Sequence, residues 1–108
     1  MGIYVTKHHH DDAVCPAGHP EMGPMLLQHL SDENAAKMGV TIKGDAVVGG
    51  HTFYMIVEAP SLDAVQQLMG PFMQAGSVEI MEASTCGQVV ARGDCGPTAN
   101  IWTGGVPA

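Results

Sequence analysis

Residues 51–58 read HTFYMIVE, and residues 60–69, which follow almost directly, read PSLDAVQQLM. The first run is rich in β-branched and aromatic residues, which is typical of a strand. In the second run Ser61 can cap a helix, and Asp63 lies in the first turn, where the helix dipole favours a carboxylate. The apolar residues then recur at helical spacing. A strand that leads into an amphipathic helix therefore anchors the prediction of the fold.

Upstream of this unit the sequence predicts two more strands with a helical segment between them. Residues 3–7 are β-branched and aromatic and predict a first strand, whereas residues 8–19 are polar, contain proline and glycine, and predict a loop. The elements expected after the loop are a helix opening at Pro20 or Glu21, a short turn over residues 32–38 between Ser31 and Gly39, and a strand over residues 40–48 interrupted near Gly44.

Downstream of residue 69 the pattern changes twice. The Gly-Pro pair at residues 70–71 predicts a kink or a division of the helix. Residues 77–83 alternate in polarity and predict a fourth strand, which residues 88–91 can extend.

The predicted element order is βαββαβ. Two crossovers of this kind on one antiparallel sheet give an α+β, ferredoxin-like fold with both helices on one face. The other face needs cover, and the same face of a second copy is the simplest cover, which predicts a homodimer, a dimeric α+β barrel. We expect the domain to span residues 1–93 and residues 94–108 to form an irregular tail that packs partly through Ile101 and Trp102.

The composition narrows the class of partner. Only 14% of the 108 residues are charged, compared with a usual value of about 25%, which favours self-association. The formal net charge is −7, and the four basic residues are scattered along the chain, so nucleic acid and anionic membrane surfaces are poor partners. No run approaches the roughly 20 apolar residues of a membrane span, and a cytoplasmic location is the default expectation.

Three stretches carry a resemblance to a known group of proteins. They are GHTFYMIVEA at residues 50–59, SLDAV at residues 61–65 and SVEI at residues 77–80. Together they resemble the small dimeric α+β-barrel proteins of unknown function, which are distant relatives of the antibiotic-biosynthesis-monooxygenase-like barrels. One subset of that group has a His-x4-Cys-Pro element after the first strand, matched here by His10, Cys15 and Pro16.

The resemblance covers roughly residues 2–92 and implies the ferredoxin-like fold. It implies no single activity, because the wider superfamily includes oxygenases, haem enzymes, isomerases and binding modules. The pair His8-His9 and the tail from residue 95 onwards depart from the pattern.

Five potential ligands gather within twelve residues: His8, His9, His10, Cys15 and His19. Imidazole and thiolate suit Fe, Cu, Zn and Ni. Neighbouring residues at a strand end point to opposite faces, so His8 and His10 can share a target while His9 points away. We therefore predict a transition metal ion, or haem, held by ligands drawn from His8, His10, Cys15, His19 and His51. A solvated loop tip is the competing interpretation.

His51 is the least secure of these ligands. The first and third strands are expected to be parallel neighbours, which places His51 near the start of the first strand and far from His10 at its end. A second subunit would then have to bring His51 to the site. His51 is nevertheless retained because it matches a histidine associated with the same subset of the resembled group.

Two residues are candidates for catalysis, Cys15 and Glu79. A thiol just before a helix can be activated by the helix N-terminus and by nearby imidazolium, although a buried structural cysteine is the alternative. Glu79 begins the fourth strand beside the end of the first, and two histidines with one carboxylate form the ligand pattern of non-haem iron oxygenases. An exposed strand residue is the competing interpretation for Glu79.

The other two cysteines, Cys86 and Cys95, make the cysteine count odd. An odd count favours free thiols or metal ligands, although a bridge between Cys86 and Cys95 stays possible.

Three functions stay open at this stage, and whether the protein is an enzyme is undecided. The first is a homodimeric metal- or haem-binding protein, with a redox enzyme or oxygenase acting on a small molecule as its enzymatic form. The second is a metal-free small-molecule-binding or stress-response module. The third is a thiol-dependent enzyme that uses Cys15.

Overall fold

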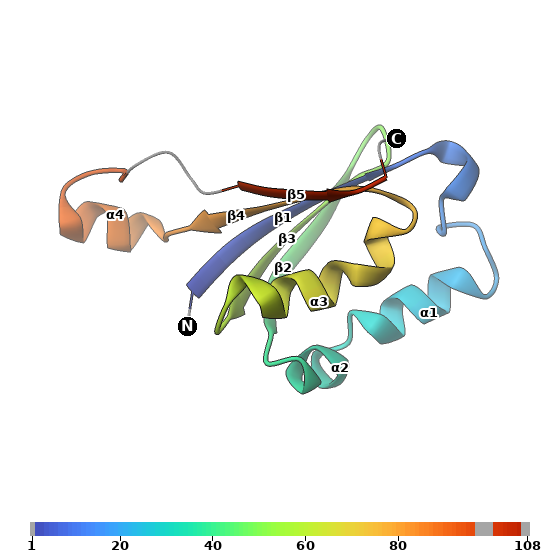
Figure 1. Cartoon of the computed structure of the whole chain (residues 1–108), viewed down its shortest axis with the longest axis horizontal. Helices are drawn as coiled ribbons and strands as arrows, with labels where there is room; N and C mark the ends of the chain where they lie inside the picture. Colours follow the sequence, from blue (N-terminus) through green and yellow to red (C-terminus); the bar gives the residue numbers. More distant parts are fainter. Residues whose placement is uncertain (1, 97–100, 107–108) are drawn as a thin grey trace.

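A computed structural model of the chain describes residues 2–96 and 101–106. Its centre is an antiparallel sheet with the strand order β2-β3-β1-β4-β5 (Figure 1). The strands are β1 (Gly2–His10), β2 (Thr41–Val48), β3 (Thr52–Ala59), β4 (Gly76–Ala83) and β5 (Ile101–Gly105). The molecule is therefore an α+β protein, and this arrangement is compatible with the predicted ferredoxin-like fold.

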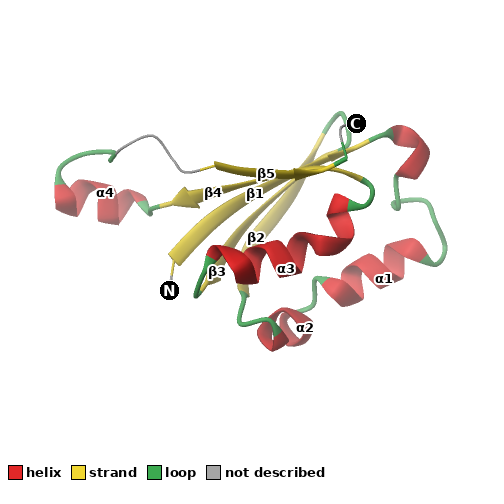
Figure 2. Ribbon diagram, viewed as in Figure 1, coloured by secondary structure: helices red, strands yellow, loops and turns green. Residues whose placement is uncertain are grey.

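The helices are η1 (Asp12–Val14), α1 (Met22–His29), α2 (Asp32–Lys37), α3 (Leu62–Met73) and α4 (Cys86–Arg92). Figure 2 shows α1, α2 and α3 on the same side of the sheet, while α4 extends beyond the end of β4. The predicted caps are confirmed, because the hydroxyl of Ser31 accepts from the Asn34 amide and that of Ser61 from the Ala64 amide. Within the described ranges, no helix has the length and apolar character needed to cross a membrane.

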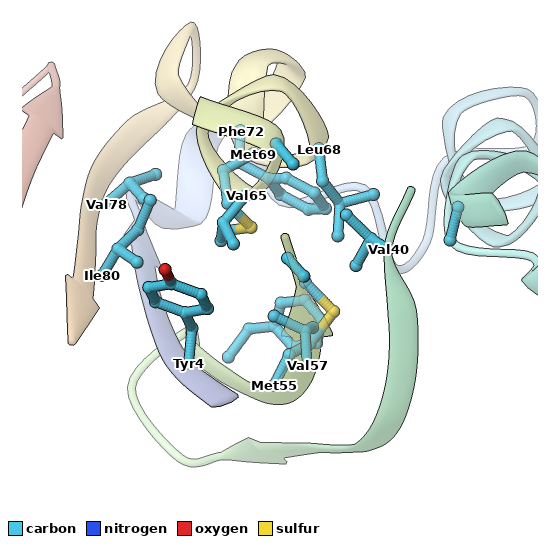
Figure 3. Packing of buried hydrophobic residues seen from close by; sticks show 14 residues of the cluster. Tyr4, Val40, Met55, Val57, Val65, Leu68, Met69, Phe72, Val78 and Ile80 are labelled. Carbon is cyan, nitrogen blue, oxygen red and sulfur yellow. The ribbon is translucent and has the colours of Figure 1, made fainter. Parts of the chain in front are cut away.

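The core lies between α3 and the inner face of the sheet (Figure 3). Helix α3 buries Ala64, Val65, Leu68, Met69 and Phe72, which confirms the predicted apolar stripe. The helix is not divided at Pro71. Proline there removes one backbone hydrogen bond, that of its missing N–H to the carbonyl four residues earlier, and the helix continues through Met73.

Strand β1 is longer than the sequence predicts. It runs to His10, so the three histidines belong to a strand and not to a loop. The reason is that β1 pairs with β3 on one side and with β4 on the other almost to its end. The backbone hydrogen bonds of a central strand outweigh the weak strand propensity of a polar run.

The C-terminal part also differs from expectation. Residues 88–91 do not extend β4 but lie in α4, which a reciprocal capping box between Thr85 and Gln88 starts and Gly93, at φ 87°, ends. The tail is not wholly irregular, because β5 adds an edge strand to β4. Trp102 packs against the core, whereas Ile101 is 59% exposed.

The second face of the sheet carries the odd-numbered residues of β1. Among the described residues no helix covers this face, which we call the open face (Figure 2). Val5 pairs there with Ile56 of β3 and with Met81 of β4, and Ile56 is 49% exposed. The predicted homodimer through this face stays a prediction.

Candidate metal centre

A row of polar side chains follows the inner face of β1 towards its C-terminal end. Thr6 and His8 are 0% and 4% exposed, and His10 continues the row at the strand end. The Nδ1–H of His8 donates to the Ser77 carbonyl at 3.0 Å, and its ring contacts Phe72 at a centroid distance of 5.1 Å. Burial lowers the pKa of His8, although the Ser77 hydrogen bond opposes this shift. His8 is therefore held as a neutral imidazole.

His51 lies next to His10 in a single chain, and the prediction that it lies far away is wrong. Strands β1 and β3 are antiparallel, so the start of β3 meets the end of β1. The His10 amide donates to the His51 carbonyl at 3.2 Å, and the two rings lie 5.1 Å apart. The physical reason is that the crossover leaves β2 parallel to β1, and the hairpin then reverses β3.

Cys15 is brought to the same place by the short helix η1. Its amide donates to the Asp12 carbonyl at 3.2 Å, which turns the chain back after β1. One ligand atom from each of His10, Cys15 and His51 lies within 4.8 Å of the others, and all three residues are half-buried. The end of a strand, a loop and a hairpin thus converge on one point.

In the part of the chain that the structure describes, the ring nitrogens of His10 lack hydrogen-bond partners. Both Nδ1 and Nε2 are buried, and neither has a hydrogen-bond partner among the described residues. A buried polar nitrogen without a partner is destabilising, on the order of 1–3 kcal/mol. Burial, followed by the nearby His51, lowers the pKa of His10, so its ring is neutral and has a free lone pair. A bound cation would satisfy that lone pair.

The backbone at this end of β1 tolerates little change. Gly76 of β4 pairs with His10, and a Cβ at Gly76 would collide with the carbonyl oxygen of His9. The absence of a side chain at Gly76 therefore allows β4 to approach and set the position of His10.

His51 has an unusual backbone conformation. Its φ is 56°, and the preceding Gly50 has a φ of 80°, so two consecutive residues of the hairpin turn are left-handed. Glycine and asparagine are the usual residues at such positions, and another residue is strained by about 1 kcal/mol. The Nε2 of His51 lies 3.1 Å from Asp12 Oδ1, which orients the ring and leaves Nδ1 with a free lone pair.

Asp12 is the one functional residue at the site that the sequence analysis missed. It is a carboxylate backing a histidine, which is the usual second partner of a metal-ligating imidazole. Its position inside the His-x4-Cys spacing was a usable signal, but the turn of η1 that directs it to His51 was not predicted. Its side chain is 88% exposed.

The donor set fits a transition metal ion. Bonds of about 2.0 Å to nitrogen and 2.3 Å to sulfur around a tetrahedral ion place the ligand atoms roughly 3.3–3.7 Å apart. In the structure the three ligand atoms lie within 4.8 Å of one another, which is compatible with this range if an ion draws them together. Among the described residues no fourth histidine, cysteine or carboxylate joins the group.

Two other predicted ligands lie outside this group of three. His8 stacks on His10 with a centroid distance of 5.4 Å, but its Nδ1 is occupied by Ser77. His19 is exposed, and its Nδ1 accepts from the amides of Glu21 and Met22 at the start of α1. His19 therefore caps a helix.

Glu79 lies on the wrong face to join the histidines. It pairs with Lys7 across β1 and β4, and residues that pair directly share a face of the sheet. That face is the open face, opposite to His10. The predicted set of two histidines with Glu79 is therefore not assembled within one chain.

All three cysteines are free thiols. Cys86 and Cys95 are exposed, whereas Cys15 is half-buried. The possible bridge between Cys86 and Cys95 is not formed.

Comparison of the chain with protein-family models, with curated proteins and with solved structures found no significant match. The site is therefore assessed on its own geometry.

Proposed function

We propose that this protein binds one transition metal ion through His10, Cys15 and His51. The observation that carries the proposal is the ring of His10. Its two buried nitrogens have no partner among the described residues, and one of them lies within 4.8 Å of a ligand atom of Cys15 and of His51. The strained backbone of His51 supports it, because a residue is kept in a left-handed conformation where glycine would be easier. The carboxylate of Asp12 behind His51 is a third support.

The chemistry of the donors favours zinc or copper. Two imidazole nitrogens and one thiolate are borderline to soft ligands, and copper and zinc lie at the strong-binding end of the divalent series. Magnesium and calcium prefer oxygen ligands and are disfavoured. Haem needs one or two axial ligands above a wide flat ring, whereas these three donors converge on one point and suit a bare ion better.

A set of three protein ligands favours a reactive site over a purely structural one. Structural zinc sites are closed by four protein ligands, whereas catalytic sites keep one position for water or substrate. Such an ion can polarise bound water or a carbonyl group. The redox or oxygenase activity and the small-molecule substrate expected from the sequence belong to this proposal, as does a homodimer formed through the open face.

A metal titration of untagged protein tests the proposal. Protein stripped with a chelator is titrated with Zn²⁺ against a chromophoric competitor, and with Co²⁺ to reveal the thiolate charge-transfer band of a Cys15 bond. We expect one equivalent per chain, and about a 100-fold or greater loss of affinity in His10→Ala, Cys15→Ser and His51→Ala. His9→Ala and His19→Ala are matched controls that keep full affinity. Less than about 0.2 equivalents in the wild type would refute the proposal.

Thiol catalysis at Cys15 is the second candidate function. The observation in its favour is that two imidazoles lie close to the thiol. Against it, the lowered pKa of His10 keeps that ring neutral, and a neutral imidazole does not stabilise a thiolate as imidazolium does. The two functions differ in the alkylation of metal-free protein. Thiol catalysis predicts that Cys15 reacts faster than the exposed Cys86 and Cys95, which serve as internal standards, whereas the metal site predicts slower reaction that Zn²⁺ suppresses further.

A further inference from the structure

The three proposed ligands differ in how strongly the rest of the fold constrains their positions. His10 and His51 belong to paired strand ends that share a backbone hydrogen bond of 3.2 Å. Cys15 belongs to residues 11–21, the connection between β1 and α1 (Figure 1). The sheet therefore supplies two ligands and the connection supplies one.

Residues 11–21 have little to hold them against the sheet. Every residue in this segment is exposed except Cys15 and Pro16, which are half-buried. Its described backbone hydrogen bonds stay within the segment or reach only the start of α1: Val14 to Asp11, Cys15 to Asp12, His19 to Pro16, Gly23 to His19 and Met25 to Glu21. The Asp12–His51 contact joins the segment to the sheet, but an ion pair with an 88% exposed carboxylate contributes little.

The following helix adds support only at its far end. All eight residues of α1 are at least partly exposed. Leu26 and Leu30 pack against the core, and His29 Nε2 donates to the Leu68 carbonyl at 2.7 Å. These contacts fix the C-terminal half of α1 and leave its start attached mainly through residues 11–21.

We propose that residues 11–21 form a strap that the metal ion closes over the sheet, so that loading of the site is coupled to ordering of this segment. The inference rests on the proposed metal site and adds its regulation. With the ion present, Cys15 is bonded to the same centre as the two histidines. Without it, the strap opens and exposes the imidazoles, which gives the ion a route in and out.

In this arrangement the histidine pair and Cys15 contribute differently to metal binding and to ordering of the strap. The pair His10 and His51 stays assembled on the sheet, so it keeps a weak binding site when the strap is open. Removal of Cys15 should therefore weaken metal binding without abolishing it, and should abolish the ordering altogether. If the site were equally rigid throughout, removal of any one of the three ligands would have the same effect on metal affinity and on the ordering of residues 11–21.

Hydrogen–deuterium exchange of the full chain tests this coupling, with and without one equivalent of Zn²⁺. We expect exchange of amides in residues 11–21 to slow about tenfold or more in the wild type when Zn²⁺ binds, while β1 and β3 change little. Val14→Ala, at a 43% exposed position of the same strap and outside the ligand group, should behave like the wild type. Cys15→Ala, measured at saturating Zn²⁺, should show no slowing.

Two results overturn the inference, and they are distinguishable. If Zn²⁺ binds but exchange in residues 11–21 is unchanged in the wild type, the metal site stands and the strap is wrong. If the competitor titration shows no Zn²⁺ binding, both the site and the strap fall. The decisive comparison uses wild-type protein with and without Zn²⁺. The inference can therefore be refuted even if a variant folds poorly.

Discussion

The amide of His10 donates to the carbonyl oxygen of His51 at 3.2 Å, and the two imidazole rings lie 5.1 Å apart. This contact joins the end of β1 to the hairpin before β3 and places two imidazoles at one edge of the sheet. Cys15 completes a group whose ligand atoms lie within 4.8 Å of one another. The proposed metal site therefore depends on the contact between His10 and His51.

Removal of the carboxylate behind His51 should weaken the site without destroying it. Asp12→Asn keeps the size of the side chain but removes the charge that orients the His51 ring, and the expected loss of Zn²⁺ affinity is about 10-fold to 100-fold. Asp11→Asn is the matched control, because Asp11 is the adjacent carboxylate and its side chain has no described contact with His51. Competition titration measures both, and equal losses in the two variants would show a general charge effect in place of a specific contact.

The strain at His51 should be visible as a stability difference. His51→Gly relieves the left-handed conformation and His51→Ala does not, so the glycine variant should be more stable by about 1 kcal/mol. Both variants should lose metal binding. Urea unfolding in the presence of a chelator measures the difference in the free energy of unfolding. Equal stabilities would indicate that the residue at position 51 is not strained.

Metal-free protein should lose stability as the solution is acidified. The pKa of His8 is lowered in the fold, chiefly by burial, with smaller contributions from His10 and His9. Below the unfolded value of 6.5 the unfolded chain takes up a proton that the folded chain resists, so the stability present above that value is lost as pH falls towards the lowered pKa.

Urea unfolding of the chelated protein between about pH 7.5 and pH 5 tests this. His8→Gln should flatten the dependence, whereas His19→Ala, at an exposed position, should leave it unchanged. A wild-type dependence that His8→Gln does not alter would assign the effect to other groups.

The open face should mediate the proposed homodimer. Ile56 is 49% exposed on this face and pairs with Val5, whereas Val47 is 74% exposed and pairs with Phe53 on the inner face. Ile56→Asp should therefore give a monomer, and Val47→Asp, the same change on the other face, should leave the dimer intact. Light scattering during size-exclusion chromatography measures the mass. A monomeric wild type would remove the homodimer from the account.

The order of the elements up to β4 and the apolar stripe of α3 could be predicted from the sequence, because helix caps and apolar periodicity are local signals. Ser61 and the stripe of α3 are examples, and both are confirmed. The end of β1 could not be predicted, because the strand conformation of His8 to His10 depends on pairing with two distant strands. The same holds for β5, whose strand conformation comes from an edge offered by β4.

The ligand types at the site were also visible in the sequence, but their grouping was not. His10 and Cys15 were expected together from their spacing. His51 was placed at the wrong end of β1 because the direction of β3 was misjudged, and Glu79 was assigned without regard to which face it shares with Lys7. Asp12 depends on the turn of η1, which a short polar sequence does not reveal.

The most direct test is the metal stoichiometry of untagged wild-type protein beside that of His10→Ala. The account predicts one equivalent of zinc or copper per wild-type chain, a thiolate charge-transfer band after cobalt substitution, and loss of both in His10→Ala with the fold retained. It is contradicted if the wild type takes up no metal, or if His10→Ala binds metal with unchanged affinity and an unchanged cobalt spectrum.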